Sequence, residues 1–448
     1  MISEAARYYN ELIEADAVLA EESSRFLLER FHAVRLELRE RILTPYLRPY
    51  FVTPSGWGRI TSACEGIWSA IDKVSRVAPT DDLLMGQLGL TEDEHRLAAI
   101  DPGYEDVSVT SRLDSFLASD SYQFVELNAE SPAGISYADV AAEIFLDLPV
   151  MRRFAERYTV TPMWCRQHML NSLLDVYRRV RGSTGKPQIA IVDFRGGPTR
   201  RGLEYFKEFF EAKGYRTTIA DPRDLEVKDG CLYHGAFRID LVYRRVLTTE
   251  LLEKIDECGA LVEAYRSGAA VLVNSFRAKY VNKKMLFGVL TDERFQHYFD
   301  QREREAIRLH VPWTRRVEDA SATYRGERIE LLEFIRRNRD RLVMKPNDEY
   351  GGRGVFIGWE VNEREWDQAI EKAIAGDYLT QERVATGREV FPWANEREGR
   401  VEMVEQLLDV CPLLFSGRVQ GGLTRLSSSS LTNVTSGAGM VPTMIVSE

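Results

Sequence analysis

The spacing of apolar residues predicts helices through roughly the first hundred positions. From Ile2 to about Tyr50, apolar side chains recur at helical spacing, as at Leu12, Leu19 and Phe26. Similar spacing continues to about Leu97. We therefore expect the chain to open with long amphipathic helices that pack on the rest of the protein through one apolar face.

The period changes at residues 111–128, where apolar and polar side chains alternate. The runs SRLDSFL and YQFVELN flank Ala118, Ser119 and Asp120. Alternation on both sides of a short polar segment predicts two strands joined by a tight turn. Helices are expected to follow at 136–145 and 161–180, the second ending near Gly182 with a proline beyond it.

From Gln188 onward, strands and helices are expected to alternate. The sequence predicts strands at 189–194, 216–222, 239–246 and 269–276, with a helix at 200–214. This alternation indicates a parallel, Rossmann-like sheet. Beyond it, strands are expected at 341–346, 354–360 and 377–384, and the chain ends in a stretch rich in Gly, Ser and Thr, with Ser427–Ser430 read as an ordered loop.

Length and composition narrow the class of protein. A chain of 448 residues with 44% hydrophobic content can bury more than one core. Its formal charge of -10 gives no electrostatic footprint for nucleic acid or an anionic membrane, so we expect neither as a partner. Its five cysteines include no CxxC pair, and no run of 18 apolar residues occurs. We expect a multi-domain cytoplasmic protein.

A glycine-rich turn after a predicted strand is the first candidate for chemistry. The run RLVMKPNDEYGGRGVFI places Lys345 on a strand and Gly351, Gly352 and Gly354 in the turn that follows. Glycines let backbone N–H groups approach phosphate oxygens, and a lysine supplies a positive charge. The lysine precedes the glycines, so this is not a P-loop. An ordinary glycine turn beside a surface lysine is the alternative.

Three oxygen-bearing side chains on the predicted hairpin are the second candidate. Glu126 and Asn128 are two residues apart on one strand and so share a face, and strand pairing can bring Asp114 alongside them. Two carboxylates and an amide oxygen are ligands that suit Mg2+. The alternative is a solvated hairpin face with ordinary polar side chains.

These motifs together resemble a known family. The run RLDSF, a turn and FVELNAESPAG resemble the metal-binding hairpin of glutathionylspermidine synthase and related circularly permuted ATP-grasp proteins. Here the hairpin precedes the Rossmann-like region and the glycine loop, and that order is the specific signal. The resemblance runs from about Ser111 onward. It implies a mixed α/β, circularly permuted ATP-grasp fold in three parts: a helical region with the metal-binding half (1–184), a Rossmann-like pre-ATP-grasp domain (185–282) and the ATP-grasp lobes (283–448).

The resemblance also implies roles for individual residues. FRAKYVNKKMLFGVL resembles a lysine-plus-helix element that contacts phosphate, with Lys284 at the lysine position and Lys283 as the alternative. DYLTQERV resembles the strand that holds adenine. The implied site comprises metal ligands Asp114, Glu126 and Asn128; phosphate or catalytic residues Arg112, Lys284 and Lys345; loop glycines Gly351, Gly352 and Gly354; and adenine contacts Gln381, Glu382 and Val384.

The function implied is an ATP- and Mg2+-dependent ligase that joins a small or peptide-like carboxylate to an amine through an acyl phosphate. Two alternatives stay open: a phosphotransferase on the same fold and a non-catalytic nucleotide-binding scaffold. A homo-oligomer is also left open. The six histidines have no HxxxH or HExxH spacing and are read as structural. Arg418 and Arg425 are most simply solvated, and the alternative is that they bind phosphate or a substrate carboxylate. The loop DFRGGPTRRG is expected to line the cleft near the substrate.

Overall fold

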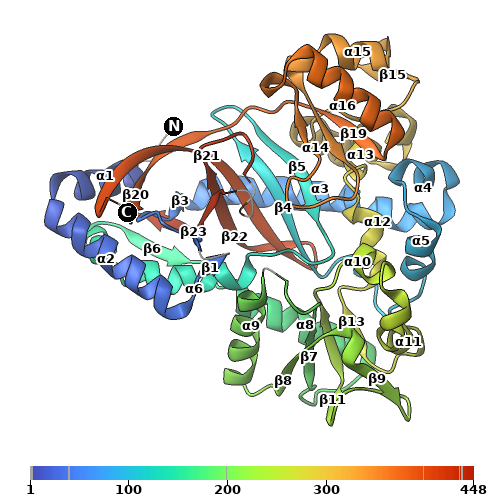
Figure 1. The fold of residues 1–448 in the computed structure, drawn as a ribbon, viewed down its shortest axis with the longest axis horizontal. Helices are drawn as coiled ribbons and strands as arrows, with labels where there is room; N and C mark the ends of the chain where they lie inside the picture. The colour runs from blue at the N-terminus through green and yellow to red at the C-terminus, as the bar shows by residue number, and fades with distance from the viewer. Residues whose placement is uncertain (1–3, 39–40, 198, 397, 433, 435–436) are drawn as a thin grey trace.

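The polypeptide forms a broad central sheet with a smaller α/β unit on either side of it (Figure 1). The structure is a computed structural model that describes residues 4–38, 41–197, 199–396, 398–432, 434 and 437–448. Pro198, Asn433, Thr435 and Ser436, which belong to the loop and the C-terminal stretch singled out above, lie outside the described residues. Within the described part of the chain, no helix is both long enough and apolar enough to cross a membrane.

The central sheet is built from both ends of the chain. Its strands run in the order β3-β23-β22-β21-β4-β5, with β20 paired to β21 and β6 paired to β23. Pairing is antiparallel except between β23 and β3. The strands are β3 (Tyr50–Val52), β4 (Thr110–Leu117), β5 (Tyr122–Asn128), β6 (Thr159–Pro162), β20 (Arg388–Asn395), β21 (Arg400–Phe415), β22 (Arg418–Ser427) and β23 (Gly439–Ser447).

The N-terminal region is only partly the helical segment that we expected. Helices α1 (Glu4–Ala15) and α2 (Ala17–Val34) confirm the first part, and the Asp16 side chain caps α2 by accepting from the N–H groups of Val18 and Leu19. The expectation of helix up to Tyr50 is wrong, because α2 ends at Val34 and the short strands β1 (Glu37–Leu38), β2 (Arg41–Ile42) and β3 follow. Helices α3 (Pro54–Val77), α4 (Asp82–Leu88) and α5 (Glu92–Ala98) then confirm the pattern up to Leu97.

A four-stranded parallel sheet occupies the middle of the chain, as expected. Its order is β13-β12-β7-β8, with all three pairings parallel. A small antiparallel sheet is inserted after β8, and its first turn, Asp229-Gly230, takes positive φ at both residues. The elements are α6 (Ile135–Leu146), α7 (Pro149–Phe154), α8 (Cys165–Arg181), β7 (Ile189–Val192), α9 (Arg200–Ala212), β8 (Thr217–Ala220), β9 (Leu225–Lys228), β10 (Cys231–His234), β11 (Phe237–Ile239), β12 (Leu241–Arg244), α10 (Thr248–Leu252), α11 (Gly259–Ser267) and β13 (Val271–Val273).

The third unit is a four-stranded sheet in the order β14-β19-β17-β18, covered by helices around a core that includes Trp366, Ile370 and Met344. In Figure 1 it stands above one end of the hairpin β4–β5. The division at residues 184 and 282 stays a prediction. The elements are α12 (Lys279–Asn282), α13 (Leu286–Thr291), α14 (Gln301–His310), β14 (Thr314–Arg316), β15 (Ser321–Tyr324), β16 (Glu327–Glu330), α15 (Leu331–Arg337), β17 (Leu342–Pro346), β18 (Phe356–Ile357), α16 (Glu363–Ala375) and β19 (Tyr378–Glu382).

Candidate functional site

Pairing of β4 with β5 brings the three expected oxygen ligands together. Asp114 lies directly opposite Glu126, and Arg112 lies opposite Asn128. The Asn128 amide donates to Asp114 Oδ2 at 3.2 Å, so the two side chains share one face. Because the hairpin closes within a few residues, this arrangement is local and follows from strand periodicity. The expected convergence of these side chains is confirmed.

Two arginines hold the Asp114 carboxylate. Arg112 donates through Nε to Oδ1 at 2.6 Å and through Nη2 to Oδ2 at 3.0 Å, and Arg425 on β22 donates to Oδ2 at 2.7 Å. Burial alone would raise the pKa of Asp114, but the charges of Arg112 and Arg425 hold that pKa well below its usual range. The Asp114 carboxylate is therefore ionised, and both of its oxygen atoms accept hydrogen bonds from arginine side chains.

Arg425 is buried, which corrects the simplest expectation for it. Only 9% of the residue is exposed, whereas Arg418 reaches outward and pairs with Glu65 at 2.8 Å. The expectation of a solvated arginine is wrong for Arg425 because antiparallel pairing of β22 with β21 and of β21 with β4 turns its side chain toward Asp114.

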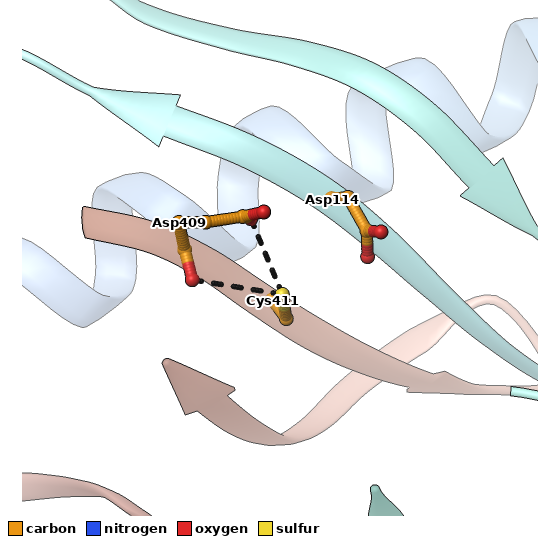
Figure 2. Close-up of side chains that lie close together, drawn as sticks. All are labelled: Asp114, Asp409 and Cys411. Carbon is orange, nitrogen blue, oxygen red and sulfur yellow. Dashed lines mark hydrogen bonds between the residues drawn. The ribbon is translucent and has the colours of Figure 1, made fainter. Parts of the chain in front are cut away.

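Asp409 on β21 completes this group of charges, and sequence reasoning missed it. Its carboxylate accepts hydrogen bonds from Arg425 and from the Thr432 hydroxyl. Figure 2 shows Asp409 beside Asp114 and the Cys411 thiol on neighbouring strands. Burial raises the pKa of Cys411 well above its usual value, so the thiol stays protonated. Asp409 therefore holds Arg425 in place beside Asp114. We call Arg112, Asp114, Asp409 and Arg425 the pocket cluster.

Lys345 extends from β17 into the same space. Its ammonium group donates to Gln381 Oε1 at 2.7 Å and to the Val125 carbonyl at 3.3 Å. The Gln381 amide in turn donates to Thr314 Oγ1 at 3.1 Å, which fixes its oxygen toward the lysine. Burial lowers the pKa of Lys345 to about 8, and the nearby carboxylate of Glu126 opposes this change. Gln381 thus orients Lys345 through its side chain.

The glycine loop follows Lys345 and needs its glycines. Gly351, Gly352 and Gly354 all have φ between 68° and 75°, where other residues are strained. Gly351 and Gly352 line the cavity described below, but Gly354 does not. A Cβ at Gly354 would lie 2.9 Å from Pro346 Cγ and 2.8 Å from the Tyr378 hydroxyl, so this glycine permits the close packing of the loop.

Adjacent lysines point to different places. Lys284 lines the cavity, where its ammonium group lies 3.2 Å from Glu126 Oε1 and donates to the Glu349 carbonyl. Lys283 is 4% exposed and pairs with Glu94 and Asp348, away from the cavity lining. The geometry therefore favours Lys284 over Lys283 for a contact with phosphate, which remains a prediction.

The end of β19 forms another wall of the cavity. Glu382 and Val384 line it, and the Glu382 carboxylate accepts from Tyr324 at 2.7 Å and from Arg325 at 2.9 Å. The Arg383 guanidinium lies 4.1 Å from the centre of the Trp359 ring. Because the Glu382 side chain is already bonded, backbone groups of this strand are the better candidates for contacts with a planar base.

One cavity of about 300 Å3 unites these elements. Of the twelve site residues that the sequence predicts, eleven line it, all except Gly354. Among the described lining residues, seven are Lys or Arg and five are Asp or Glu. An excess of positive charge around a concave site suits a polyanionic ligand.

The comparisons with known proteins fit this geometry. The family model described as circularly permuted ATP-grasp type 2 matches residues 117–427. A putative glutamate–cysteine ligase 2-2 of Frankia casuarinae is 28% identical over 211 residues, which are 45% of this chain and 23% of that protein. An uncharacterized protein of Mycobacterium leprae is 24% identical over 389 residues, 81% of this chain and 65% of that protein. The matched region spans less than two thirds of each of these relatives.

Structural comparison supports the same fold. A glutathione synthetase like-effector from Globodera pallida, solved in the apo form, superimposes with a TM-score of 0.61 over 97% of this chain and 98% of that one. At 12% identity, this likeness concerns the fold alone. The family match covers more than half of the chain and includes Glu126, Lys345 and strand β19. The mixed α/β fold is confirmed, and the chain belongs to the circularly permuted ATP-grasp type 2 family.

Proposed function

We propose that this protein is an ATP- and Mg2+-dependent ligase that joins a carboxylate to an amine. The observation that carries the proposal is the convergence of a carboxylate pair, a glycine loop and several cationic side chains on one cavity. Family membership supports ATP as the nucleotide. The relative from Frankia casuarinae, a putative glutamate–cysteine ligase, supports formation of a carbon–nitrogen bond.

The cationic residues would bind and orient the polyphosphate. Lys284, Lys345, Arg112 and Arg425 line the cavity together with Gly351 and Gly352 of the glycine loop. In this arrangement, a substrate carboxylate oxygen attacks the terminal phosphorus and ADP leaves, giving an acyl phosphate. An amine nitrogen then attacks the acyl carbon, loses its proton and displaces phosphate. Positioning and charge stabilisation supply most of the rate enhancement.

The residues present fit a magnesium ion. Asp114, Glu126 and Asn128 offer hard oxygen atoms on one strand pair, and Glu126 has a side chain that is 29% exposed toward the cavity. When bound, Mg2+ would neutralise part of the charge on the polyphosphate. Asp114 would first have to release at least one of its arginine partners, which then become available to the phosphates.

The second substrate would bind at the carboxyl edge of the parallel sheet. The strand order changes direction between β7 and β12, and ligands of such sheets bind at this point. The buried Arg245 follows β12 and donates to the Pro132 carbonyl at 2.8 Å, while its Nε atom and the Ser131 hydroxyl lack protein partners among the described residues. Residues 129–134 join this edge to Asn128, and Arg112 donates to the Ala133 carbonyl. A carboxylate held by Arg245 would therefore lie near the phosphate site.

The test starts from binding and proceeds to products. Calorimetry of wild-type protein with ATP, with and without Mg2+, is expected to show binding that depends on the metal. Incubation with MgATP, candidate amino acids or peptides and hydroxylamine is then expected to release ADP and to yield a hydroxamate, because hydroxylamine captures an acyl phosphate. Turnover that requires an amine separates a ligase from a phosphotransferase, which needs none.

A matched pair of variants controls the assay. Arg425→Met removes a buried cation at the cavity, whereas Arg418→Met removes an exposed one on the same strand. Loss of MgATP binding in the first and retention in the second would support the proposal. A wild-type protein that binds no nucleotide at millimolar concentration would overturn it in favour of a scaffold.

A further inference from the structure

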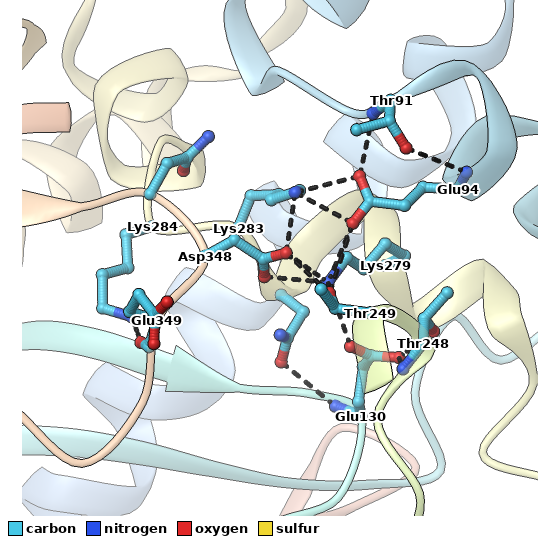
Figure 3. Close-up of polar contacts among 12 residues, drawn as sticks. Thr91, Glu94, Glu130, Thr248, Thr249, Lys279, Lys283, Lys284, Asp348 and Glu349 are labelled. Atoms are coloured by element: carbon cyan, nitrogen blue, oxygen red, sulfur yellow. Dashed lines mark hydrogen bonds and ion pairs between the residues drawn. The ribbon is translucent and has the colours of Figure 1, made fainter. Parts of the chain in front are cut away.

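A buried cluster of charges lies at the foot of the glycine loop, outside the cavity lining. Figure 3 shows most of its members meeting from separate elements of the fold. We call it the anchor cluster: Glu94 from α5, Glu130 after β5, Arg244 from β12, Lys279 from α12, Lys283 after α12, and Asp348 after β17. Its three cations and three carboxylates balance one another.

Asp348 is the member that ties the glycine loop to this cluster. Its carboxylate accepts from Lys279 at 2.8 Å through both oxygens, and from Lys283 and the Thr249 hydroxyl at 2.8 Å each. The two lysines are four residues apart, so they project from one side of their segment. Burial would raise the pKa of Asp348, but Lys279 and Lys283 keep that pKa well below its usual range, so the carboxylate is charged.

The neighbours of Asp348 tie the two phosphate-side segments to each other. Asn347 accepts from the Met285 N–H through its side chain at 2.8 Å, and its carbonyl accepts from the Lys284 N–H at 3.0 Å. On the other side, the Glu349 carbonyl accepts from the Lys284 ammonium group. Residues 347–349 are therefore hydrogen-bonded to the segment from which Lys284 enters the cavity, and Asp348 adds ion pairs at the centre of these contacts.

We propose that Asp348 is a positioning residue, which sets the glycine loop against Lys284 although it is not among the described residues that line the cavity. This inference rests on the proposed nucleotide site. Asp348 does not touch the nucleotide on this view; it acts through the loop backbone. Its loss misplaces donors that must meet phosphate oxygens within about half an ångström.

The anchor cluster also fixes the position of the segment that follows the hairpin β4–β5. Glu130 accepts from Arg244 at 3.1 Å and lies 3.4 Å from Lys279. It belongs to the segment that joins Asn128 to the edge of the parallel sheet. Lys279 thus contacts both Asp348, at the start of the glycine loop, and Glu130, in the segment that follows the hairpin. These contacts fix the two segments relative to each other.

The first experiment separates position from charge. Asp348→Glu keeps the negative charge but lengthens the side chain by one methylene, which pushes the loop away from its lysines. We expect near wild-type thermal stability and MgATP binding weaker by about tenfold. Calorimetry and thermal unfolding measure the two quantities on the full chain. Wild-type affinity in this variant would overturn the proposal.

A charge-balanced pair of substitutions covers the case in which a single variant unfolds. Asp348→Asn leaves the anchor cluster with one uncompensated positive charge, and Lys283→Met in the same chain restores neutrality. The double variant is expected to regain the stability that Asp348→Asn loses and to bind MgATP about tenfold more weakly than wild type. Amide exchange of residues 349–354 should be faster in it.

The outcomes distinguish this proposal from the proposed function. If the double variant recovers both stability and affinity, Asp348 serves charge balance alone and the positioning role is refuted while the nucleotide site stands. If wild-type protein itself binds no MgATP, the proposed function fails first, and exchange of residues 349–354 still reports whether Asp348 orders the loop. Unchanged exchange in both variants would refute that role as well.

Discussion

The pocket cluster and the anchor cluster are both buried and each pairs equal numbers of cations and carboxylates, yet they differ in their surroundings and in access. In the anchor cluster, three cations face three carboxylates, and Lys279, Lys283, Glu94 and Glu130 are each no more than 4% exposed. The pocket cluster, by contrast, faces a cavity that can admit a ligand and that is lined by more basic than acidic side chains. A closed, charge-balanced cluster fixes geometry, whereas a cavity lined by more basic than acidic side chains is completed by an anion. The difference suggests that one cluster serves stability and the other binding.

The largest expected effect is on stability and comes from the anchor cluster. Glu130→Gln removes the charge that faces Arg244 and Lys279 in a site with 1% exposure. Leaving the buried Arg244 without its carboxylate partner among the described residues is expected to lower the free energy of unfolding by about 3 kcal/mol. Urea denaturation measures this change. If Glu130→Gln unfolds at the wild-type urea concentration, the anchor cluster does not stabilise the fold, and the contrast with the pocket cluster fails.

The second effect is on binding and comes from the cavity. Lys345→Met removes a buried ammonium group whose folded environment already disfavours its charge. MgATP affinity is expected to fall by about a hundredfold, the cost of a charged hydrogen bond, with little loss of stability. Calorimetry and thermal unfolding on the same preparation check both parts. A variant that loses stability but keeps its affinity would reverse the assignment of the two clusters.

The local half of the site could be predicted from the sequence. Asp114, Glu126 and Asn128 meet because strand periodicity and a short turn place them together, and the glycines of the loop are visible as a run. The family resemblance identified Arg112, Lys284 and the strand 377–384 as site residues, which periodicity alone could not have done. The parallel sheet also followed from alternating strands and helices, since each of those elements is defined by neighbouring residues.

The non-local half could not be predicted. Asp409 and Arg425 reach Asp114 only because β21 pairs with β4 across some three hundred positions. The burial of β21 is continuous from Leu407 to Phe415, so its apolar run carries no alternation that marks a strand. Asp348 was likewise unremarkable in the sequence, because its partners come from separate elements that pack together only in the folded chain.

A third prediction uses pH to test the electrostatics of the cavity. With a pKa of about 8, Lys345 is mostly charged at pH 7 and mostly neutral at pH 9 in the free protein. A bound polyphosphate favours the charged form, so binding above pH 8 takes up a proton and affinity falls as pH rises. We expect about a tenfold loss between pH 7 and pH 9.

Calorimetry in two buffers of different ionisation enthalpy counts the protons directly. Proton uptake is expected near pH 8 in wild-type protein and is expected to disappear in Lys345→Met, which has no group to titrate there. The anchor-cluster variant Asp348→Glu should retain the uptake, because it leaves Lys345 in place. A flat affinity profile in wild-type protein would mean that Lys345 does not contact the phosphates.

The smallest expected effect concerns metal binding without nucleotide. In the ligand-free protein, Arg112 and Arg425 occupy the Asp114 carboxylate, so a divalent cation that arrives alone must displace an arginine into a cavity already rich in positive charge. A nucleotide offers those arginines phosphate oxygens in exchange, so metal and nucleotide should bind together. Arg425→Met removes one of the three donors to Asp114 Oδ2, the others being Arg112 and Asn128, and removes one positive charge.

This variant is therefore expected to bind Mn2+ without nucleotide about tenfold more tightly than wild type, even as it loses affinity for MgATP. Electron paramagnetic resonance of free Mn2+ measures the first quantity, and Arg418→Met, on the same strand but exposed, should leave it unchanged. If wild-type protein already binds Mn2+ alone as tightly as Arg425→Met does, Arg425 does not weaken metal binding at Asp114. The pocket cluster would then be as fixed as the anchor cluster, and the excess positive charge of the cavity lining would have to act on the nucleotide alone.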